Sequence, residues 1–275
     1  MTITVTGATG HLGKLILSEL KGHDVRAVAR RPEAVEGPAQ EVRYGDYERP
    51  ESLPNAIEGT DTLVLISASE LGKRFPQHRA VVDAAVEAKV GRIAYVSITK
   101  ADTSTIAIAA EHKATEEYIK ASGLPYTFLR NNWYLENYTA NLAGTLEHGA
   151  VLGSARDGRI AAATRADFAT AAAVVATTDG HDGKAYELGG DRAFTLTELA
   201  QALTVRFGTQ VVYRDLPVEE FAGALESFGV PNVFALALAQ SDGEIAKGAL
   251  DVVTGDLSRL IGRPTTTLEE LLSKL

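Results

Sequence analysis

The sequence contains no cysteine, a single methionine and a single tryptophan among its 275 residues. The absence of cysteine excludes disulfide bonds, thiol nucleophiles and thiolate metal sites, and it fits a reducing compartment. The longest apolar runs, at 63–66 and 169–176, are far shorter than the roughly 20 residues that a helix needs to cross a bilayer. The chain opens on an expected strand, which leaves no room for a signal peptide. We therefore expect a cytoplasmic protein without a membrane span.

Basic residues and several catalytic motifs are also scarce. Lys and Arg total 27 against 36 Asp and Glu, and the net charge is −9. No basic stripe is visible, so a nucleic-acid partner is disfavoured. The sequence lacks His-Glu-x-x-His, Gly-x-Ser-x-Gly and Walker motifs, and we expect no metal. It also lacks Tyr-x-x-x-Lys, the pair whose lysine lowers the tyrosine pKa so that the phenol can protonate a carbonyl oxygen.

A glycine-rich turn near the N-terminus is the strongest motif that is present. Residues 3–13 read Ile-Thr-Val-Thr-Gly-Ala-Thr-Gly-His-Leu-Gly, and a helical apolar pattern follows. A strand, a glycine turn and a helix in this order favour dinucleotide binding. Gly7 would allow the tight turn, Gly10 the close approach of a pyrophosphate, and Gly13 the packing of helix against strand. The helix N-terminus would bind the phosphates. A glycine turn without a ligand is the alternative.

The first half of the chain alternates between strand-like and helix-like segments. The expected strands are 3–6, 25–29, 41–44, 62–67, 92–97 and 126–130, and the expected helices lie near 12–20, 51–57, 78–88 and 114–121. The strands are continuous apolar runs, which is typical of strands covered by helices on both faces. We therefore predict an α/β fold with a Rossmann-type, doubly wound parallel sheet.

The second half is less regular, and we assign it to a smaller lobe. Residues 1–150 are expected to form the NAD(P)-binding Rossmann domain. Residues 151–275 are expected to form a C-terminal α/β lobe, partly interleaved with the first, that covers a substrate. Within it we expect a helix over 164–177, and Thr195 as an N-cap with Glu198 completing a capping box. Helices at the lobe edges could pair two chains into a homodimer, although nothing marks which helices.

The end of the second strand predicts which nicotinamide coenzyme is used. NAD-binding domains usually carry a carboxylate there, which binds the ribose 2′-hydroxyl. Here the strand ends in Arg30 and Arg31, and arginine suits bidentate contact with a 2′-phosphate. Such a charge-assisted bond contributes roughly 1.5–3 kcal/mol, so we predict NADPH. An exposed basic turn is the alternative, and Asp46 could instead face the adenine.

Two further segments follow strands at the carboxyl edge of the sheet, where ligands bind. Residues 130–138 combine three asparagines with the single tryptophan and two tyrosines. Aromatic faces can stack on a flat ring, and asparagine can hold a carboxamide or carbonyl group. Ser67, Ala68 and Ser69 follow the fourth strand, where backbone groups commonly contact ribose. The alternatives are an aromatic packing cluster and a polar turn.

Several motifs together resemble one known family. They are Thr-Gly-Ala-Thr-Gly-His-Leu-Gly at 6–13, the arginine after the second strand, Leu-Ile-Ser-Ala-Ser-Glu at 65–70, Pro-Gln-His-Arg at 76–79, Leu-Arg-Asn-Asn-Trp-Tyr-Leu-Glu-Asn-Tyr at 129–138, Ala-Thr-Arg-Ala-Asp-Phe at 163–168 and Ile-Gly-Arg-Pro-Thr-Thr-Thr-Leu at 261–268. They resemble the bacterial type-2 NAD(P)H:quinone oxidoreductases, in the NmrA-like, atypical branch of the short-chain dehydrogenases. The glycine motif is common to many proteins, whereas the aromatic and C-terminal motifs are more specific.

The resemblance implies a set of NADPH contacts. They fall at Gly7, Thr9, Gly10, His11, Leu12 and Gly13, at Arg30 or Arg31, at Ser67, Ala68 and Ser69, at Asn132, Trp133, Tyr134, Leu135, Glu136 and Asn137, and at Arg165. It also implies direct hydride transfer to a quinone, without flavin or metal. A quinone accepts hydride readily and its product protonates from water, so the protein has mainly to place the nicotinamide C4 about 3–3.5 Å from the acceptor.

Under this hypothesis four residues take part in the reaction. Trp133 and its neighbours stack on the quinone or the nicotinamide, and Asn132 orients a carbonyl. His112 or Tyr134 is an optional proton donor. The His112 assignment comes from related isoflavone-reductase-like enzymes, which carry a lysine near this position, and Lys113 is next to it. Two other functions stay open: an NADP-binding redox sensor without catalysis, and a reductase of another small carbonyl compound.

Overall fold

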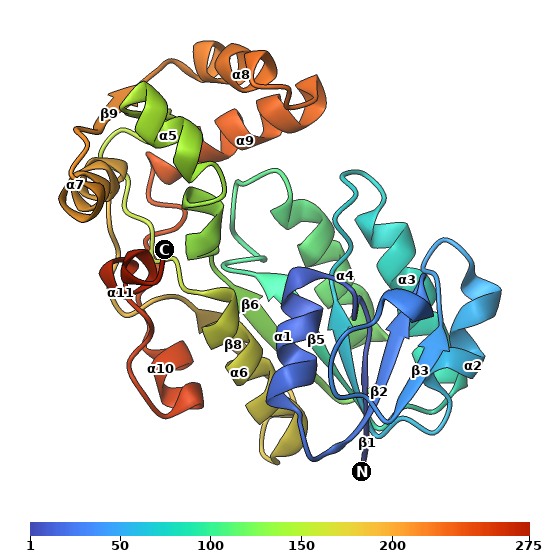
Figure 1. Cartoon of the computed structure of the whole chain (residues 1–275). Helices are drawn as coiled ribbons and strands as arrows, with labels where there is room; N and C mark the ends of the chain where they lie inside the picture. Colours follow the sequence, from blue (N-terminus) through green and yellow to red (C-terminus); the bar gives the residue numbers. More distant parts are fainter.

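The computed structural model describes residues 1–275 and shows a parallel sheet with helices on both faces (Figure 1). Seven strands pair in the order β3-β2-β1-β4-β5-β6-β8, and every pairing is parallel. The strands are β1 Thr2–Val5, β2 Asp24–Ala29, β3 Glu41–Tyr44, β4 Thr62–Ile66, β5 Arg92–Ile98, β6 Tyr126–Asn131 and β8 Lys184–Leu188. The predicted α/β fold with a doubly wound parallel sheet is confirmed.

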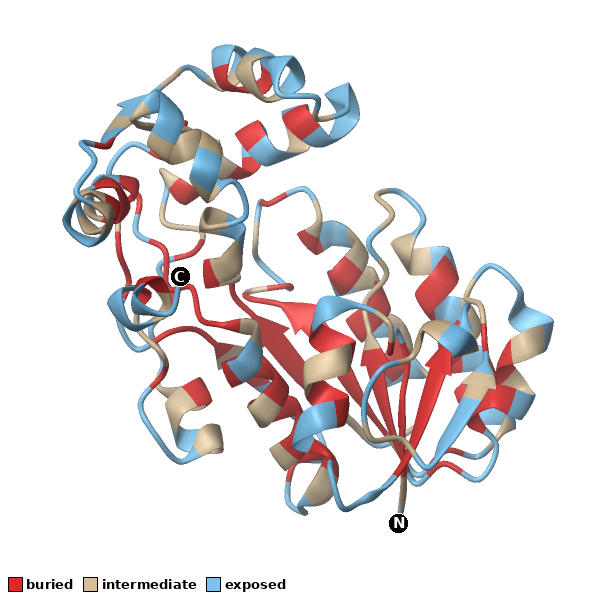
Figure 2. Ribbon diagram, in the orientation of Figure 1, coloured by how far each residue is buried: buried red, intermediate tan, exposed pale blue.

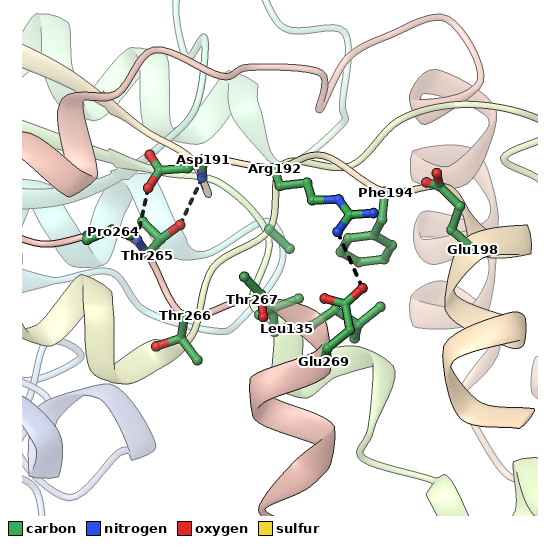
Figure 3. Close-up of a pocket in the computed structure, with 12 residues that line it drawn as sticks. Leu135, Asp191, Arg192, Phe194, Glu198, Pro264, Thr265, Thr266, Thr267 and Glu269 are labelled. Carbon is green, nitrogen blue, oxygen red and sulfur yellow. Dashed lines mark hydrogen bonds and ion pairs between the residues drawn. The ribbon is translucent and has the colours of Figure 1, made fainter. Parts of the chain in front are cut away.

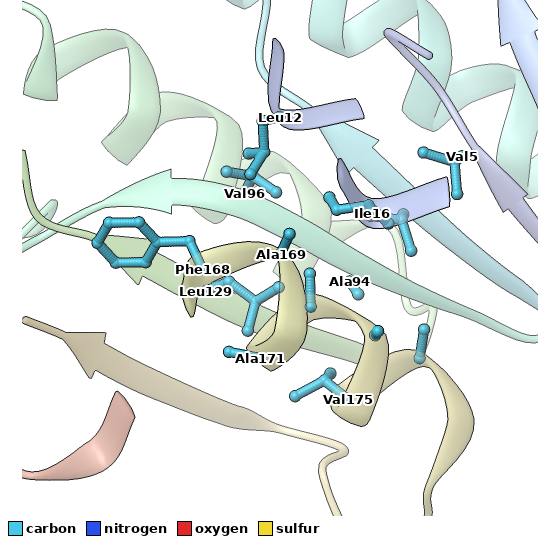
Figure 4. Packing of buried hydrophobic residues seen from close by; sticks show 14 of the residues in the cluster. Val5, Leu12, Ile16, Ala94, Val96, Leu129, Phe168, Ala169, Ala171 and Val175 are labelled. Atoms are coloured by element: carbon cyan, nitrogen blue, oxygen red, sulfur yellow. The ribbon is translucent and has the colours of Figure 1, made fainter. Parts of the chain in front are cut away.

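Two layers of helices bury this sheet. On one face, α1 (His11–Glu19) and α6 (Arg165–Thr177) share an apolar cluster with strands β1, β2, β5 and β6 (Figure 4). On the other face, α2 (Leu53–Ile57), α3 (Arg74–Glu87) and α4 (Ala109–Ala121) pack over a second cluster. Figure 2 shows the central strands buried, whereas the edge strand β3 is largely exposed. The strands with continuous apolar sequences are therefore the central ones, which helices cover on both faces, as expected.

Some element boundaries differ from the sequence prediction. Helices α3 and α4 begin four and five residues earlier than expected, at Arg74 and Ala109. Their first turns, Arg-Phe-Pro-Gln and Ala-Ala-Glu-His, mix polar residues with proline and alanine, so the apolar periodicity that indicates a helix in sequence is weak there. The helix expected over 51–57 is divided into a 3-10 turn, η2 (Pro50–Ser52), and α2. A second 3-10 turn, η1, covers Pro32–Ala34.

The chain after residue 150 contributes to both parts of the molecule. Helix α6 and strand β8 return to the main sheet, with β8 paired to β6. Helix α10 (Asp256–Ile261) also packs on α6 and β8. The lobe contains η3 (Leu135–Tyr138), α5 (Leu142–His148), β7 (Ala150–Gly153), α7 (Leu196–Phe207), β9 (Val212–Asp215), α8 (Val218–Ser227), α9 (Asn232–Ile245) and α11 (Leu268–Ser273). The division at residue 150 stays a prediction.

Local capping signals in this half of the chain behave as the sequence indicates. Thr195 and Glu198 form both hydrogen bonds of the predicted capping box at the start of α7. Thr164 caps α6 by accepting a hydrogen bond from the Asp167 amide. The predicted capping box and the helix over 164–177 are confirmed. None of the helices combines the length and apolar character needed to span a bilayer.

Candidate functional site

A cleft of about 420 Å³ crosses the carboxyl ends of β1, β2 and β4. Twelve of the residues predicted to contact NADPH line it: Gly7, Thr9, Gly10, His11, Leu12, Gly13, Arg30, Ser67, Ala68, Ser69, Tyr134 and Arg165. These residues come from five separate segments, and the parallel sheet brings the segments together because its strands all end at the same edge.

The glycine turn between β1 and α1 forms the floor of the cleft. Gly7 has a φ of +62°, in the left-handed region that favours glycine. A Cβ atom on Gly13 would lie 2.3 Å from the Gly7 carbonyl oxygen, so only glycine lets α1 approach the turn this closely. The N-cap Gly10 offers no side chain to the first amides of α1, and no acidic residue occupies the first turn. These amides therefore fit an anionic group such as a pyrophosphate.

One end of the cleft carries a cation. Arg30 follows β2 and is exposed, and its nearest carboxylate is that of Glu70 at 3.9 Å. Arg31 does not line the cleft. Asp46, which follows β3, lines the same end, and its Oδ1 accepts a hydrogen bond from the Glu48 amide. Arg30 is therefore the better placed of the two arginines to bind a phosphate.

The turn at residues 67–69 is held in place from α3. The Ala68 amide donates to His78 Nε2 at 2.9 Å, and Arg74 Nε donates to the Ala68 carbonyl at 2.6 Å. Burial lowers the pKa of His78 to about 3, so the ring is neutral and Nε2 is free to accept the amide. The turn that borders the cleft is thus fixed by both of its central backbone groups.

The other end of the cleft is aromatic and cationic. The Arg165 guanidinium lies 4.4 Å from the centre of the Tyr134 ring, a cation–π contact. Glu136 accepts the Arg165 amide hydrogen at 2.9 Å, and Asn137 Oδ1 accepts a hydrogen bond from the guanidinium at 2.8 Å. Glu136 and Asn137 do not line the cleft. They orient Arg165, which does.

Three of the other predicted residues lie outside the cleft lining. Asn132 is buried, its Nδ2 donates to the Leu250 carbonyl at 3.1 Å, and its Oδ1 accepts the Trp133 amide at 2.7 Å. Trp133 packs against the small apolar cluster of Ile98, Ala101 and Ala109. Leu135 is buried in the lobe core. The Asn132 amide is therefore occupied within the protein, and the contacts predicted for these three residues stay predictions.

His112 also lies outside the cleft lining and is buried on α4. Its Nδ1 is 2.7 Å from the Tyr95 hydroxyl. Burial lowers the pKa of His112 to about 3, so the imidazole is neutral at physiological pH. This charge state argues against a role as a cationic acid, and the proton-donor role of His112 stays a prediction.

The sequence did not single out several residues that line the cleft. They are Val28, Ala29, Gly45, Tyr47, Ile66, Glu70 and Gln77. Glu70 and Gln77 belong to motifs that carry the family resemblance, at 65–70 and 76–79, and these motifs could have indicated that the two residues belong to the site. Tyr47 had no such signal, because its place depends on hydrogen bonds to Thr6 and the Ile66 carbonyl on other strands.

Two other hollows belong to the lobe. A cavity of about 120 Å³ lies beside the chain segment before α11 (Figure 3), where Asp191 and Thr265 exchange two hydrogen bonds of 2.9 Å. A wider cleft of about 670 Å³ lies beside α9 and reaches Thr105, in the loop after β5. Neither includes the glycine turn, so the cleft at the sheet edge is the candidate site.

The doubly wound parallel sheet, the glycine turn and the uncapped start of α1 define a dinucleotide-binding protein. A family model described as NAD(P)H-binding matches residues 7–188, and the chain belongs to this family. It is 48% identical to Quinone oxidoreductase 2 of Escherichia coli (strain K12), over 99% of this chain and 98% of that protein.

Solved structures give the same relationship. The crystal structure of an NADPH-dependent quinone oxidoreductase from Escherichia coli, complexed with NADPH, matches with a TM-score of 0.95 at 47% identity and covers 99% of both chains. The Citrobacter sp. triphenylmethane reductase complexed with NADP(H) matches with a TM-score of 0.93 at 37% identity, again over 99% of both chains. The resemblance predicted from the motifs is confirmed.

Proposed function

We propose that this chain is an NADPH-dependent quinone oxidoreductase that transfers hydride directly to a quinone, without flavin or metal. The observation that carries the proposal is the cleft itself, in which uncapped amides of α1 and the Arg30 guanidinium face one continuous groove. The full-length likeness to the Escherichia coli enzyme supports the same reaction.

Each part of the cleft has a role in this proposal. The first amides of α1 bind the pyrophosphate, and Arg30 binds the 2′-phosphate. Tyr134 and Arg165 form a flat wall at the opposite end. When bound, NADPH supplies the hydride from its nicotinamide ring. Because a quinone that has gained a hydride takes its remaining proton from water, the chain needs no Tyr-x-x-x-Lys pair, which it lacks.

The test is a direct assay of turnover. Protein, NADPH and a simple benzoquinone are mixed, and oxidation of NADPH is followed by absorbance at about 340 nm. Protein-free and heat-denatured samples are the controls, because quinones can oxidise NADPH unaided. Steady, protein-dependent turnover supports the proposal, whereas tight NADPH binding without turnover contradicts it.

A redox sensor is the second candidate, since the chain has no Tyr-x-x-x-Lys pair and His112 is buried outside the cleft lining. Binding without turnover, on quinones and on a panel of other carbonyl compounds, would favour it. The absence of cysteine supports a reducing compartment such as the cytoplasm as the site of action. Light scattering would test the expected homodimer.

A further inference from the structure

His78 is a fully buried histidine on α3, and both of its ring nitrogens have hydrogen-bond partners within the protein. Its Nε2 accepts a hydrogen bond from the Ala68 amide at 2.9 Å, and its Nδ1 lies 2.9 Å from Thr115 Oγ1 on α4. Ala68 is the middle residue of the turn at 67–69, which lines the cleft. The imidazole therefore connects a wall of the cleft to α4, which lies outside the cleft lining.

The partners of His78 leave only one place for its ring hydrogen. The Ala68 amide can only donate, so Nε2 accepts and carries no hydrogen. The Thr115 hydroxyl donates its own hydrogen to the Glu111 carbonyl at 2.8 Å, so its oxygen is left to accept from Nδ1–H. The Tyr95 hydroxyl lies 3.3 Å from the same nitrogen. Burial lowers the pKa of His78 to about 3, and the ring therefore stays neutral in this tautomer.

The other tautomer would place two donors against each other. A hydrogen on Nε2 would face the Ala68 N–H, and that amide would lose its partner inside the protein. Arg74 Nε donates to the Ala68 carbonyl at 2.6 Å, so side chains of α3 hold both backbone groups of Ala68. Ser67 and Ser69, on either side of it, line the cleft. Fixing the middle residue from behind therefore sets how the two serines are presented to a ligand.

We propose that His78 is a positioning residue for coenzyme binding, which acts through the Ala68 amide and takes its tautomer from Thr115. The ring keeps the turn at 67–69 in the conformation that receives the coenzyme, so that binding does not have to order the turn. His78 does not line the cleft, and it acts without contacting the ligand. The inference rests on the proposed function, because it takes the ligand to be NADPH.

Two substitutions of His78 separate the roles of its two nitrogens. The side-chain oxygen of glutamine reaches the place of Nε2, whereas that of asparagine reaches only the place of Nδ1. His78→Gln should therefore keep an acceptor for Ala68 and bind NADPH within about threefold of the wild type. In His78→Asn the amide loses its acceptor. If the turn is then correctly placed in about a tenth of the molecules, the dissociation constant rises about tenfold. Titration of NADPH fluorescence measures both constants.

Steady-state kinetics distinguish positioning of the coenzyme from general damage to the enzyme. In His78→Asn the KM for NADPH should rise about tenfold, while kcat at saturating NADPH stays within about twofold of the wild type, because a bound coenzyme restores the turn. NADH should weaken by the same factor as NADPH, since the turn at 67–69 is separate from Arg30. A loss confined to NADPH, or a loss in kcat alone, would overturn the inference.

A second pair of variants tests the tautomer without changing His78. Thr115→Val removes the acceptor for Nδ1–H and keeps the shape of the side chain, whereas Thr115→Ser keeps the hydroxyl. Because the Tyr95 hydroxyl remains near Nδ1, we expect Thr115→Val to weaken NADPH binding only about threefold, and Thr115→Ser to bind like the wild type. This pair also carries the test if His78→Asn does not fold. Equal binding by the two Thr115 variants would overturn the inference.

His181→Asn is the matched control. His181 is also buried, and its two nitrogens lie 2.8 Å from the Thr178 and Tyr186 hydroxyls. It precedes β8, at the amino edge of the sheet, whereas the cleft lies at the carboxyl edge. This variant should lower the melting temperature and leave NADPH binding unchanged.

Two results with the His78 variants would overturn the inference. One is a folded His78→Asn that binds NADPH as tightly as the wild type. The other is a His78→Gln that binds as weakly as His78→Asn, because the acceptor at the place of Nε2 would then be irrelevant. Failure of the wild type to bind NADPH would instead refute the proposed function.

Discussion

A Gly13→Ala substitution tests whether the close approach of α1 to the glycine turn creates the phosphate site. The added Cβ would lie 2.3 Å from the Gly7 carbonyl oxygen and 2.9 Å from the Ala8 Cα, and both of these are backbone atoms. Ordinary contact begins near 3.4 Å, so α1 has to retreat by about 1 Å. The retreat is opposed by the fully buried Ile16 and Leu17, which pack α1 into the cluster shared with α6 (Figure 4).

The size of the effect follows from this packing. Overpacking of a tight interior costs about 1–3 kcal/mol, and in a chain of this length each 1 kcal/mol lowers the melting temperature by about 2–4 °C. We therefore expect Gly13→Ala to melt roughly 2–12 °C lower. We also expect NADPH to bind at least tenfold more weakly, because hydrogen bonds weaken steeply when donors are displaced by about 1 Å.

Gly223→Ala is the matched control for this prediction. Gly223 is also a helical glycine, in α8, but a Cβ there meets nothing within 4 Å. Alanine is favoured over glycine inside a helix by about 0.8–1.0 kcal/mol, so this variant should melt at the wild-type temperature or slightly above. Both variants are measured by thermal unfolding and by NADPH titration. If Gly13→Ala melts within 2 °C of the wild type and binds NADPH normally, the reasoning is refuted.

Three further predictions concern charge and packing. Arg30→Ala should lower NADPH affinity about ten- to a hundredfold and leave NADH affinity unchanged. Arg31 lies outside the cleft, so Arg31→Ala should change the ratio of NADPH affinity to NADH affinity little. Equal losses of NADPH affinity in both variants would contradict this. Burial raises the pKa of Asp242 to about 6, so the folded state favours the protonated carboxyl group. The free energy of unfolding is therefore highest below about pH 4, and it falls by about 3 kcal/mol as the pH rises through 6. Urea unfolding across this range should show that loss in the wild type and not in Asp242→Asn. Trp133→Ala should reduce kcat/KM for a benzoquinone more than fivefold if the indole stacks on quinone or nicotinamide; a smaller loss would restrict Trp133 to packing against Ile98 and its neighbours.

The elements of the sheet edge could be predicted from the sequence because their signals are local. The strand into Gly7, the helix after Gly13 and the capping box at Thr195 each depend on residues within a few positions of one another. The same holds for Arg30, which needs only the end of β2 to place it at the cleft. Parallel strands that end at one edge then bring these local features together.

Other parts of the site depended on contacts between distant segments. The Asn132 amide looks available for a ligand in sequence, yet it bonds the Leu250 carbonyl, 118 positions away. His112 looks like a candidate acid until burial beside Tyr95 leaves its ring neutral. Gln77 was visible only as part of a motif, and its place in the cleft wall depends on the contacts that hold α3 beside the turn at residues 67–69.

The sequence by itself determined the order of strands and helices, the glycine turn and the expected coenzyme, because backbone geometry and hydrophobic periodicity are encoded over short stretches. Only the tertiary structure decided which polar atoms face the cleft and which already form hydrogen bonds within the protein. That difference arises because hydrogen bonds and burial are settled between segments far apart in the chain, so residue type alone does not reveal whether a donor or acceptor is still free.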